Sequence, residues 1–197
     1  MVTYPVTLKR FRRFFTEGIA LAAAVNPHFT PSHFNETLVS PKVKHRSRMA
    51  WWVAERALAS VGFPSHAVPL FFDAPGGSPT ETSFANLLAV VDGTVVTPPR
   101  HLILDGISLR VTEELCGQLG IPFRESRIEP FAPPHVSEAM LVGSGFGIAA
   151  VRSFQASPES PPTVFAWPGP IFQRLLAGWS ELTGTGIECE FSETAVN

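Results

Sequence analysis

Three kinds of group in this sequence could act together in chemistry, and the first is a lysine amine. The chain has only Lys9, Lys42 and Lys44, with no lysine after Lys44. Lys44 shares a basic segment with Arg46 and Arg48, where like charge and desolvation favour the neutral, nucleophilic form of the amine. The segment also fits a solvated lysine ahead of a helix. The low number of lysines is also explained by a general preference for arginine, of which the chain has twelve against three lysines. Lys42 is an alternative, because residues two apart on a strand share a face.

The second group is the carboxyl of Glu81. It follows the glycine turn Gly76-Gly77 and lies in the extended segment Pro79–Asn86. Pointing inward, this acid could keep a pyridine nitrogen protonated, which makes such a ring an electron sink. Pointing outward, it would be an ordinary surface glutamate. Both orientations are compatible with the sequence.

The third group is a pair of turns that could bind an anion. Gly106-Ile107-Ser108 opens a predicted helix, where free N–H groups and a hydroxyl form an anion site. Simple capping of the helix by Ser108 explains the same residues. Gly143-Ser144 begins a second glycine turn, which matches neither a dinucleotide fingerprint, a P-loop nor a nucleophile elbow.

Together these groups are what an enzyme needs to hold pyridoxal phosphate. The aldehyde needs an amine, the pyridine nitrogen needs a carboxylate, and the phosphate needs backbone N–H groups.

Composition excludes several other classes of protein. The chain has 197 residues, of which 45% are hydrophobic and 16 are Phe, so it can bury a core. Its net charge of −2 gives no positive potential that would attract nucleic acid or an anionic membrane. Cys116 and Cys189 fit no zinc spacing, and His28 and His33 have no third ligand at suitable spacing. The apolar run Ile19–Val25 is too short to span a bilayer and lacks a cleavage site. We therefore expect a soluble, cytoplasmic protein without a metal.

The order of predicted elements indicates an α+β fold rather than a doubly wound array. Asn26–Pro41 is predicted to be loop. Strands are expected at Tyr4–Leu8, Ile19–Val25, Val68–Phe72, Asn86–Val91, Val95–Thr97, Glu125–Ile128, Ala139–Val142 and Ile148–Phe154. Helices are expected within Phe11–Ala24, from Ser47 to Gly62 with Met49, Trp52, Val53, Ala57 and Val61 at helical spacing, at Ser108–Leu119, and at Pro170–Thr183.

In their joint order these segments resemble the class IV, fold-type-IV pyridoxal-phosphate enzymes, namely branched-chain and D-amino-acid aminotransferases and 4-amino-4-deoxychorismate lyase. The similarity extends from Val43 to Thr183. It is carried by Val43-Lys44-His45-Arg46-Ser47-Arg48, Thr80-Glu81-Thr82-Ser83-Phe84-Ala85-Asn86-Leu87, Asp92-Gly93-Thr94-Val95-Val96-Thr97-Pro98-Pro99, Ile103-Leu104-Asp105-Gly106-Ile107-Ser108, the segment from Ser137-Glu138-Ala139 to Gly143-Ser144, and Pro168-Gly169-Pro170.

The resemblance implies a cofactor, pyridoxal 5'-phosphate, and a role for each matching residue. Lys44 would be the Schiff-base lysine and the acid–base group, and Glu81 would pair with the pyridine nitrogen. Leu104 would pack near the ring. The phosphate would be held by two turns, one with Gly106, Ile107 and Ser108 and the other with Gly143 and Ser144. The substrate would be an amino acid or keto acid, and the protein would be a homodimer.

The chain also departs from the family pattern. Met49 stands where the branched-chain members carry a tyrosine, and Ser108-Leu109 replaces Thr-Arg. The family has a small α/β domain before the lysine segment, which supplies an arginine to the phosphate, whereas only 43 residues precede Lys44 here. We therefore expect residues 1–41 to be a remnant of that domain plus a linker and residues 42–197 to be the large cofactor-binding domain. The alternative function is a truncated, catalytically impaired domain.

Overall fold

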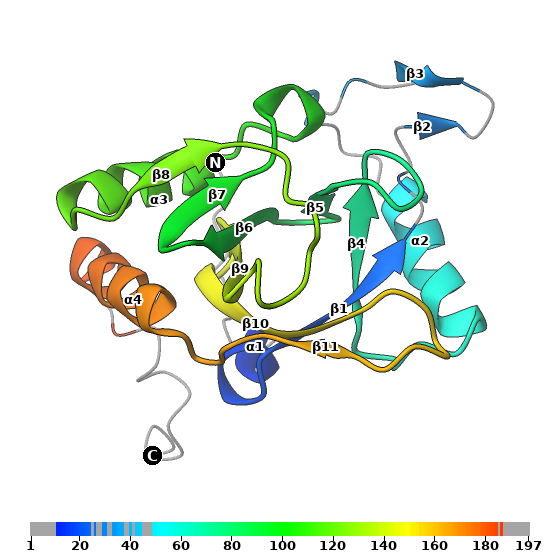
Figure 1. Cartoon of the computed structure of the whole chain (residues 1–197). Coiled ribbons are helices and arrows are strands. Elements are labelled where there is room, and N and C mark those ends of the chain that lie inside the picture. The colour runs from blue at the N-terminus through cyan, green and yellow to red at the C-terminus, as the bar shows by residue number, and fades with distance from the viewer. Residues whose placement is uncertain are drawn as a thin grey trace, which may run out of the picture.

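A computed structural model describes residues 11–24, 26, 29–30, 33–37, 40, 42–44, 49–184 and 186 (Figure 1). The chain alternates short helices with strands in a mixed α+β order, as the sequence predicts. The helices are α1 (Arg12–Thr16), α2 (Met49–Ser60), the 3-10 helix η2 (Arg100–Leu102), α3 (Ile107–Gln118) and α4 (Pro170–Thr183). The strands are β1 (Ile19–Ala24), β2 (Phe29–Thr30), β3 (His33–Thr37), β4 (Val68–Phe72), β5 (Pro79–Thr82), β6 (Asn86–Val91), β7 (Thr94–Thr97), β8 (Phe123–Glu125), β9 (Glu138–Gly143), β10 (Gly147–Gln155) and β11 (Thr163–Val164).

The main sheet closes on itself into a barrel. Its order is β11-β10-β1-β4-β5-β6-β7-β8, and β9 pairs with both β10 and β6. The strands β10, β1, β4, β5, β6 and β9 therefore form a continuous ring, with β1 parallel to both of its neighbours. Such closure leaves no strand of the ring with an unpaired edge. β7, β8 and β11 extend the sheet outside the ring.

Alternating side chains divide the core into an inner and an outer layer. On β6, Leu87 and Ala89 belong to the cluster inside the ring, whereas Leu88 and Val90 belong to the cluster under α3 and α4. This follows from the two-residue period of a strand. Because both faces are covered, these strands read as continuous apolar runs. Aromatic rings fill part of the inner layer, where Phe131 contacts Phe154 and Phe165.

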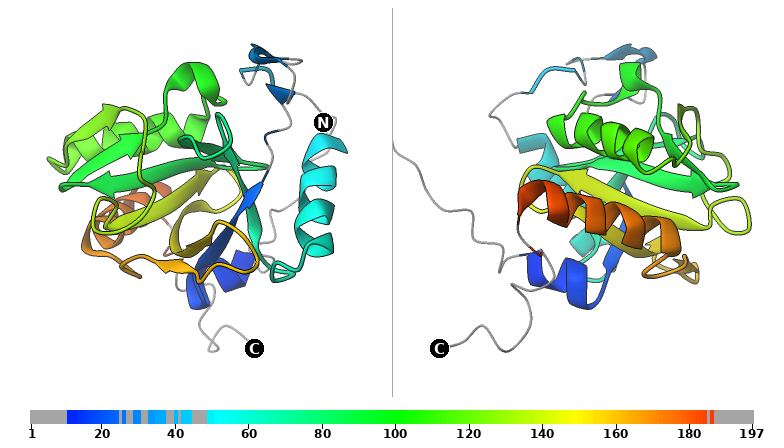
Figure 2. Two further views of the ribbon diagram at one scale, coloured as in Figure 1. Left: turned by 45° about the vertical axis from the view of Figure 1, so that its right-hand side comes forward. Right: turned by 90° about the vertical axis from the view of Figure 1, so that its left-hand side faces the viewer.

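α3 and α4 lie side by side over one outer face of the barrel (Figure 2). The two helices are joined by a hydrogen bond of 3.3 Å from the Trp179 Nε1–H to Thr112 Oγ1. The outer layer of the core lies between them and the sheet. α3 is the helix whose start carries the predicted anion site, so this packing fixes the helix relative to β6 and β9.

α2 packs against β1 and β4 on another side of the barrel, but with a different face from the one the sequence pattern indicates (Figure 1). Ala54 and Leu58 are buried, whereas Met49, Trp52 and Val53 are exposed. The guanidinium of Arg56 lies 5.4 Å from the Trp52 ring centroid. The helix was therefore predicted correctly, but its periodic apolar residues form an outward face.

The structure agrees with most predicted elements and corrects two regions. The strand predicted at Glu125–Ile128 lies earlier in the chain, as β8, because residues 123–125 are the ones that pair with β7. The predicted loop 26–41 is wrong in part, because β2 and β3 pair there as an antiparallel ladder. Main-chain hydrogen bonds form such a ladder without apolar periodicity, so the sequence pattern did not reveal it. The strand that pairs with β4 is the short strand β5, which lies in the predicted extended segment Pro79–Asn86. The predicted strand Tyr4–Leu8 lies outside the described residues.

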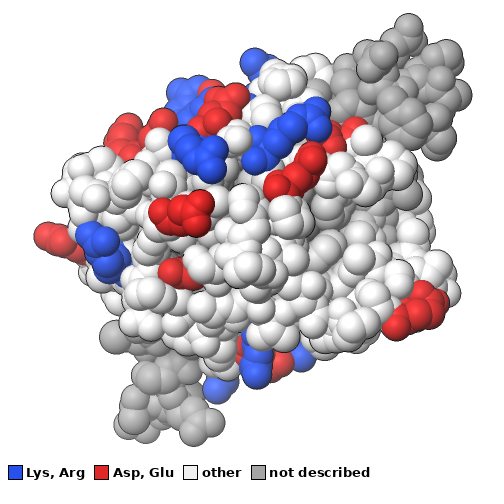
Figure 3. All heavy atoms as spheres, in the orientation of Figure 1, with Lys and Arg blue, Asp and Glu red and all other residues white. Residues whose placement is uncertain are grey.

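β1 falls within residues 1–41, ahead of the predicted domain boundary, and it pairs with β10 and β4 in the main sheet. On the face seen in Figure 3, charged side chains gather in the upper part, over the region of β7 and α3, and most of the remaining surface is uncharged. Within the described ranges, no helix is long and apolar enough to cross a membrane. The same residues contain no cluster of His, Cys, Asp and Glu that could hold a metal ion.

Candidate functional site

The site begins at the tight turn between β5 and β6. Thr82 Oγ1 donates to the Ala85 carbonyl at 3.0 Å and accepts from the Ala85 N–H at 3.1 Å, which closes the turn. Glu81 and Asn86 flank this turn and are direct cross-strand partners. Opposed residues of an antiparallel pair place their side chains on one face. The turn therefore brings a carboxyl group and a carboxamide together.

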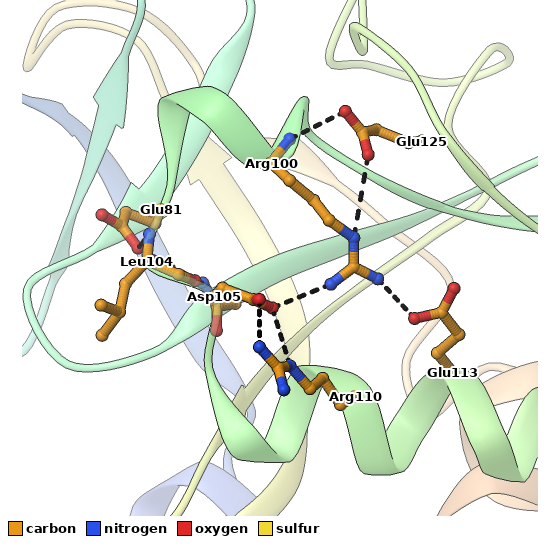
Figure 4. Close-up of polar contacts among 8 residues, drawn as sticks. Glu81, Arg100, Leu104, Asp105, Arg110, Glu113 and Glu125 are labelled. Carbon is orange, nitrogen blue, oxygen red and sulfur yellow. Dashed lines mark hydrogen bonds and ion pairs between the residues drawn. The ribbon is translucent and has the colours of Figure 1, made fainter. Parts of the chain in front are cut away.

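Leu104 joins this pair from the segment before α3 (Figure 4). The Leu104 N–H donates to Glu81 Oε2 at 3.0 Å, and Asn86 Nδ2 donates to the Leu104 carbonyl at 2.8 Å. Asn86 Nδ2 also donates to Glu81 Oε2 at 3.3 Å. Both hydrogen bonds to Glu81 therefore end on the same oxygen, and the other oxygen is bonded to no described residue. The sequence did not single out Asn86 as a site residue, although its spacing from Glu81 across a short turn was visible.

Burial makes Glu81 an unusual acid. Its side chain is 7% exposed and is held inside the protein, so the inward orientation is the one observed. Burial raises the pKa of Glu81 to about 7, and the hydrogen bond from Leu104 partly opposes this rise. An acid in this state is stabilised as a carboxylate when a cationic partner approaches.

The start of α3 lies directly against Asn86. Gly106 precedes the helix, and a Cβ at this position would overlap Asn86 Oδ1, so that any other residue would displace the Asn86 side chain. No side chain among the described residues caps the helix, so its first N–H groups can donate to a further partner. Ser108 is buried, and its hydroxyl makes no hydrogen bond to another described residue. Ile107 is 78% exposed. Simple capping by Ser108 is therefore not what the structure shows.

The second glycine turn reaches the same place through β9. Asn86 pairs with Val142, so Gly143 comes next to the β5–β6 turn. A Cβ on Gly143 would lie 3.2 Å from the Phe84 carbonyl oxygen and 3.1 Å from Phe146 Cε1, closer than a side chain normally packs. Ser144 follows as an exposed residue of the turn. Both candidate anion turns therefore adjoin Asn86.

Lys44 and Lys42 lie in the segment before α2, and both side chains are exposed. No contact among the described residues joins either lysine to Glu81. Arg46 and Arg48, the basic neighbours of Lys44, lie outside the described residues. The assignment of the amine to Lys44 stays a prediction, while Glu81, Leu104 and the two turns are gathered around Asn86.

Comparison with known proteins identifies the family. The sequence model described as "Amino-transferase class IV" matches residues 21–154, more than half of the chain. The chain belongs to the class IV aminotransferase family. The matched range includes Lys44, Glu81, both anion turns and at least part of every strand of the barrel. No curated protein matches the sequence.

Solved structures share the fold at low identity. A 4-amino-4-deoxychorismate lyase from Pseudomonas aeruginosa has a TM-score of 0.65 at 22% identity, covering 91% of this chain and 60% of its own. A branched-chain aminotransferase from Thermoproteus uzoniensis, solved with norvaline, has a TM-score of 0.66 at 21% identity, covering 92% and 55%. A branched-chain amino acid aminotransferase from Thermobaculum terrenum, solved in its PLP-form (holo-form), has a TM-score of 0.63 at 20% identity, covering 88% and 52%. The class IV chain thus spans little more than half the length of these structures.

Proposed function

We propose that this class IV protein binds pyridoxal 5'-phosphate and acts on an amino acid, with Lys44 as the reactive amine. The observation that carries the proposal is the convergence on Asn86 of a buried acid and two glycine turns. The Thermobaculum terrenum relative, solved in its PLP-form, supports the same cofactor class. A homodimer in the cytoplasm belongs to the same proposal, and the exposed apolar face of α2 is consistent with a subunit contact.

The described residues fit this cofactor in two respects. One oxygen of Glu81 accepts from no described residue, and the pKa of this acid is raised to about 7. A protonated ring nitrogen would therefore complete an ion pair with it. The start of α3 and the Ser108 hydroxyl, which have no side-chain partner among the described residues, offer donors to a phosphate. The glycine turn at Gly143 and Ser144 would add backbone donors beside them.

Each residue would then have a separate task. When bound, pyridoxal phosphate supplies an aldehyde that condenses with amines and a ring that accepts electron density. Lys44 Nζ would be the amine that holds the cofactor through its aldehyde, and the base that takes the proton from the substrate α-carbon. Glu81 would keep the ring nitrogen protonated. Leu104 would pack near the ring, while Gly106, Ile107, Ser108, Gly143 and Ser144 would hold the phosphate.

A titration with pyridoxal phosphate tests the binding part of this proposal. Replacement of Ser108 by alanine removes a donor to a charged oxygen, so we expect a dissociation constant about tenfold larger. The matched control is Ser180→Ala, on α4 away from the site. Absorbance or tryptophan quenching follows binding. The same affinity for Ser108→Ala and Ser180→Ala would contradict the phosphate site.

The reaction is either transamination or the elimination of pyruvate from aminodeoxychorismate. Solved structures of both types share the fold. Met49 in place of the tyrosine of the branched-chain members favours the lyase or D-amino-acid type. Assays of pyruvate release and of keto-acid-dependent amino transfer, with several L- and D-amino acids, separate the two. Amino transfer without pyruvate release would rule out the lyase assignment.

A catalytically impaired domain is the second candidate. One observation favours it: this chain matches only 52–60% of the length of the compared structures. Much of the rate in such enzymes comes from excluding water and from preorganised charge around the reacting groups. The test compares turnover by this chain with that by a version extended upstream. Equal turnover by both would contradict impairment.

A further inference from the structure

The segment Leu104–Gly106 forms a tight turn whose two ends serve different parts of the site. The Gly106 N–H donates to the Leu104 carbonyl at 2.9 Å, and that carbonyl also accepts from Asn86 Nδ2. The Leu104 N–H faces Glu81, and Gly106 lies against Asn86 Oδ1 at the start of α3. The conformation of this one turn therefore sets both the donor to Glu81 and the position of the helix start. Asp105 is the residue at its apex.

Two arginines, Arg100 and Arg110, contact the Asp105 side chain (Figure 4). Arg100, in η2 before the turn, donates from Nη1 to Asp105 Oδ1 at 2.9 Å. Arg110, on the first turns of α3, donates from Nε to Asp105 Oδ1 at 3.2 Å, and its Nη2 pairs with Asp105 Oδ2. A carboxylate that accepts from two guanidinium groups is restricted in direction as well as stabilised in charge. The hydrogen bond from Arg110 leads the causes that hold the pKa of Asp105 below its ordinary value.

Arg100 is itself anchored to elements outside the turn. Its Nη2 pairs with Glu113 of α3, its Nε lies 3.7 Å from Glu125 Oε2, and its backbone N–H donates to Glu125 Oε1 at 2.9 Å. Arg100 is 27% exposed at its side chain, less than Arg110 at 63%. Arg100 thus connects the turn to α3 through Glu113 and to the edge strand β8 through Glu125.

We propose that Asp105, held between Arg100 and Arg110, is a positioning residue that keeps the Leu104 N–H on Glu81 and the start of α3 on Asn86. It touches neither substrate nor cofactor and acts through the backbone of its own turn. The inference rests on the proposed function, in which Glu81 is the acid that faces the ring nitrogen. The brace formed by Asp105 with Arg100 and Arg110 links the acid to the phosphate-binding turn. The Asp105 side chain therefore controls the geometry of both.

The test uses the full chain without cofactor and compares Asp105→Asn with Asp92→Asn. Asparagine keeps the shape of Asp105 but loses its charge, and Asp92 is a turn residue remote from the brace. We expect the Leu104 amide of Asp105→Asn to exchange its hydrogen about tenfold faster, because a charged hydrogen bond is worth roughly this factor or more. Carbon-13 NMR of labelled glutamate, assigned with Glu81→Gln, should show the Glu81 titration moving to higher pH, since the Leu104 donor lowers its pKa. A role in stability alone would not move this titration.

Arg100→Met provides a second variant, with Arg124→Met as its control. Arg124 is an exposed residue of β8 with no ion pair among the described residues. Arg100→Met should reproduce both shifts, and Arg100→Lys should restore them in part, because lysine keeps the charge but lacks the guanidinium fork. Unchanged Leu104 exchange and an unchanged Glu81 titration in Asp105→Asn and Arg100→Met would overturn the inference.

Cofactor affinity separates this inference from the function on which it rests. Pyridoxal phosphate should bind about tenfold more weakly to Asp105→Asn than to Asp92→Asn. No binding to the unaltered chain would contradict the proposed function, whereas the amide exchange and the Glu81 titration would still decide whether Asp105 positions the turn.

Discussion

Glu81 lies in surroundings that oppose its own negative charge. Burial raises its pKa to about 7, although the Leu104 N–H donates to one oxygen. No ionised side chain contacts it among the described residues. In the proposed function this cost has a use, because the carboxylate gains most when a cationic ring nitrogen enters the site.

The raised pKa of Glu81 predicts a pH dependence of stability. Between the ordinary pKa of 4.5 and about 7, the folded protein binds this proton more tightly than the unfolded chain does. The free energy of unfolding should therefore fall as pH rises through this window, by up to about 3 kcal/mol from this group. Glu81→Gln should abolish that fall.

Urea unfolding of both proteins in the absence of cofactor, at pH 5 and pH 8, measures the difference. Taking the difference between Glu81→Gln and the unaltered chain at each pH removes the effect of the other titrating groups. An equal change with pH in the two proteins would show that Glu81 does not titrate as described.

Sequence alone reached the residue types of the site but not their orientation. Glu81, Ser108 and the glycine turns stand out because few residue types fit an acid or an anion turn. Whether Glu81 points inward depends on Asn86 and Leu104, which approach it only through the register of β5 with β6 and the path of the chain before α3. The brace around Asp105 was missed, because Arg100, Glu113 and Glu125 come from separate elements and carry no common spacing.

At the scale of elements, α4 is held to the barrel by a buried acid on β9. Glu138 Oε1 accepts from the Ile171 N–H at 3.0 Å, and Oε2 accepts from the Phe172 N–H at 2.8 Å. These are free donors of the first turn of α4, and a carboxylate near a helix start is favoured by the helix dipole. One side chain thus provides the cap that the preceding glycine lacks.

We predict that Glu138→Ala lowers the free energy of unfolding by about 2 kcal/mol or more. The reason is that two buried N–H groups would lose their acceptor. Urea unfolding at neutral pH measures the change. Glu114→Ala is the control, because Glu114 is an exposed residue of α3. A loss no larger than that of the control would contradict the capping role.

Elements with strong local signals were predicted best. α4 has Pro170 at its start and an apolar face, and β4 is bounded by turn residues, so the predicted and observed bounds agree. The apolar residues of α2 instead face outward, because periodicity reports that a helix has an apolar side but does not identify what covers it. The buried residues of this helix are Ala54 and Leu58. With only these two, one of them small, the buried face has a weaker apolar periodicity than the exposed face.

At the scale of the whole molecule, the closed ring of strands determines where the site forms. β9 joins β10 to β6 and so brings Gly143 beside the β5–β6 turn, although Asn86 and Gly143 lie 57 positions apart in the sequence. The family resemblance indicated this arrangement, whereas strand patterns alone gave no pairing order. Pairing between distant strands depends on register and closure, which no local pattern encodes.

The proposed function depends on which amine reacts with the cofactor. Lys44 lies before α2, and the acid and anion turns lie on the barrel and at the start of α3. Cofactor chemistry requires the chain to bring them together. The most direct measurement is borohydride reduction of the chain loaded with pyridoxal phosphate, followed by mass spectrometry of its peptides. We expect absorbance in the near-visible region that reduction removes, with the cofactor attached to Lys44 Nζ. Attachment to Lys42 or Lys9, or no stable attachment, would contradict this assignment.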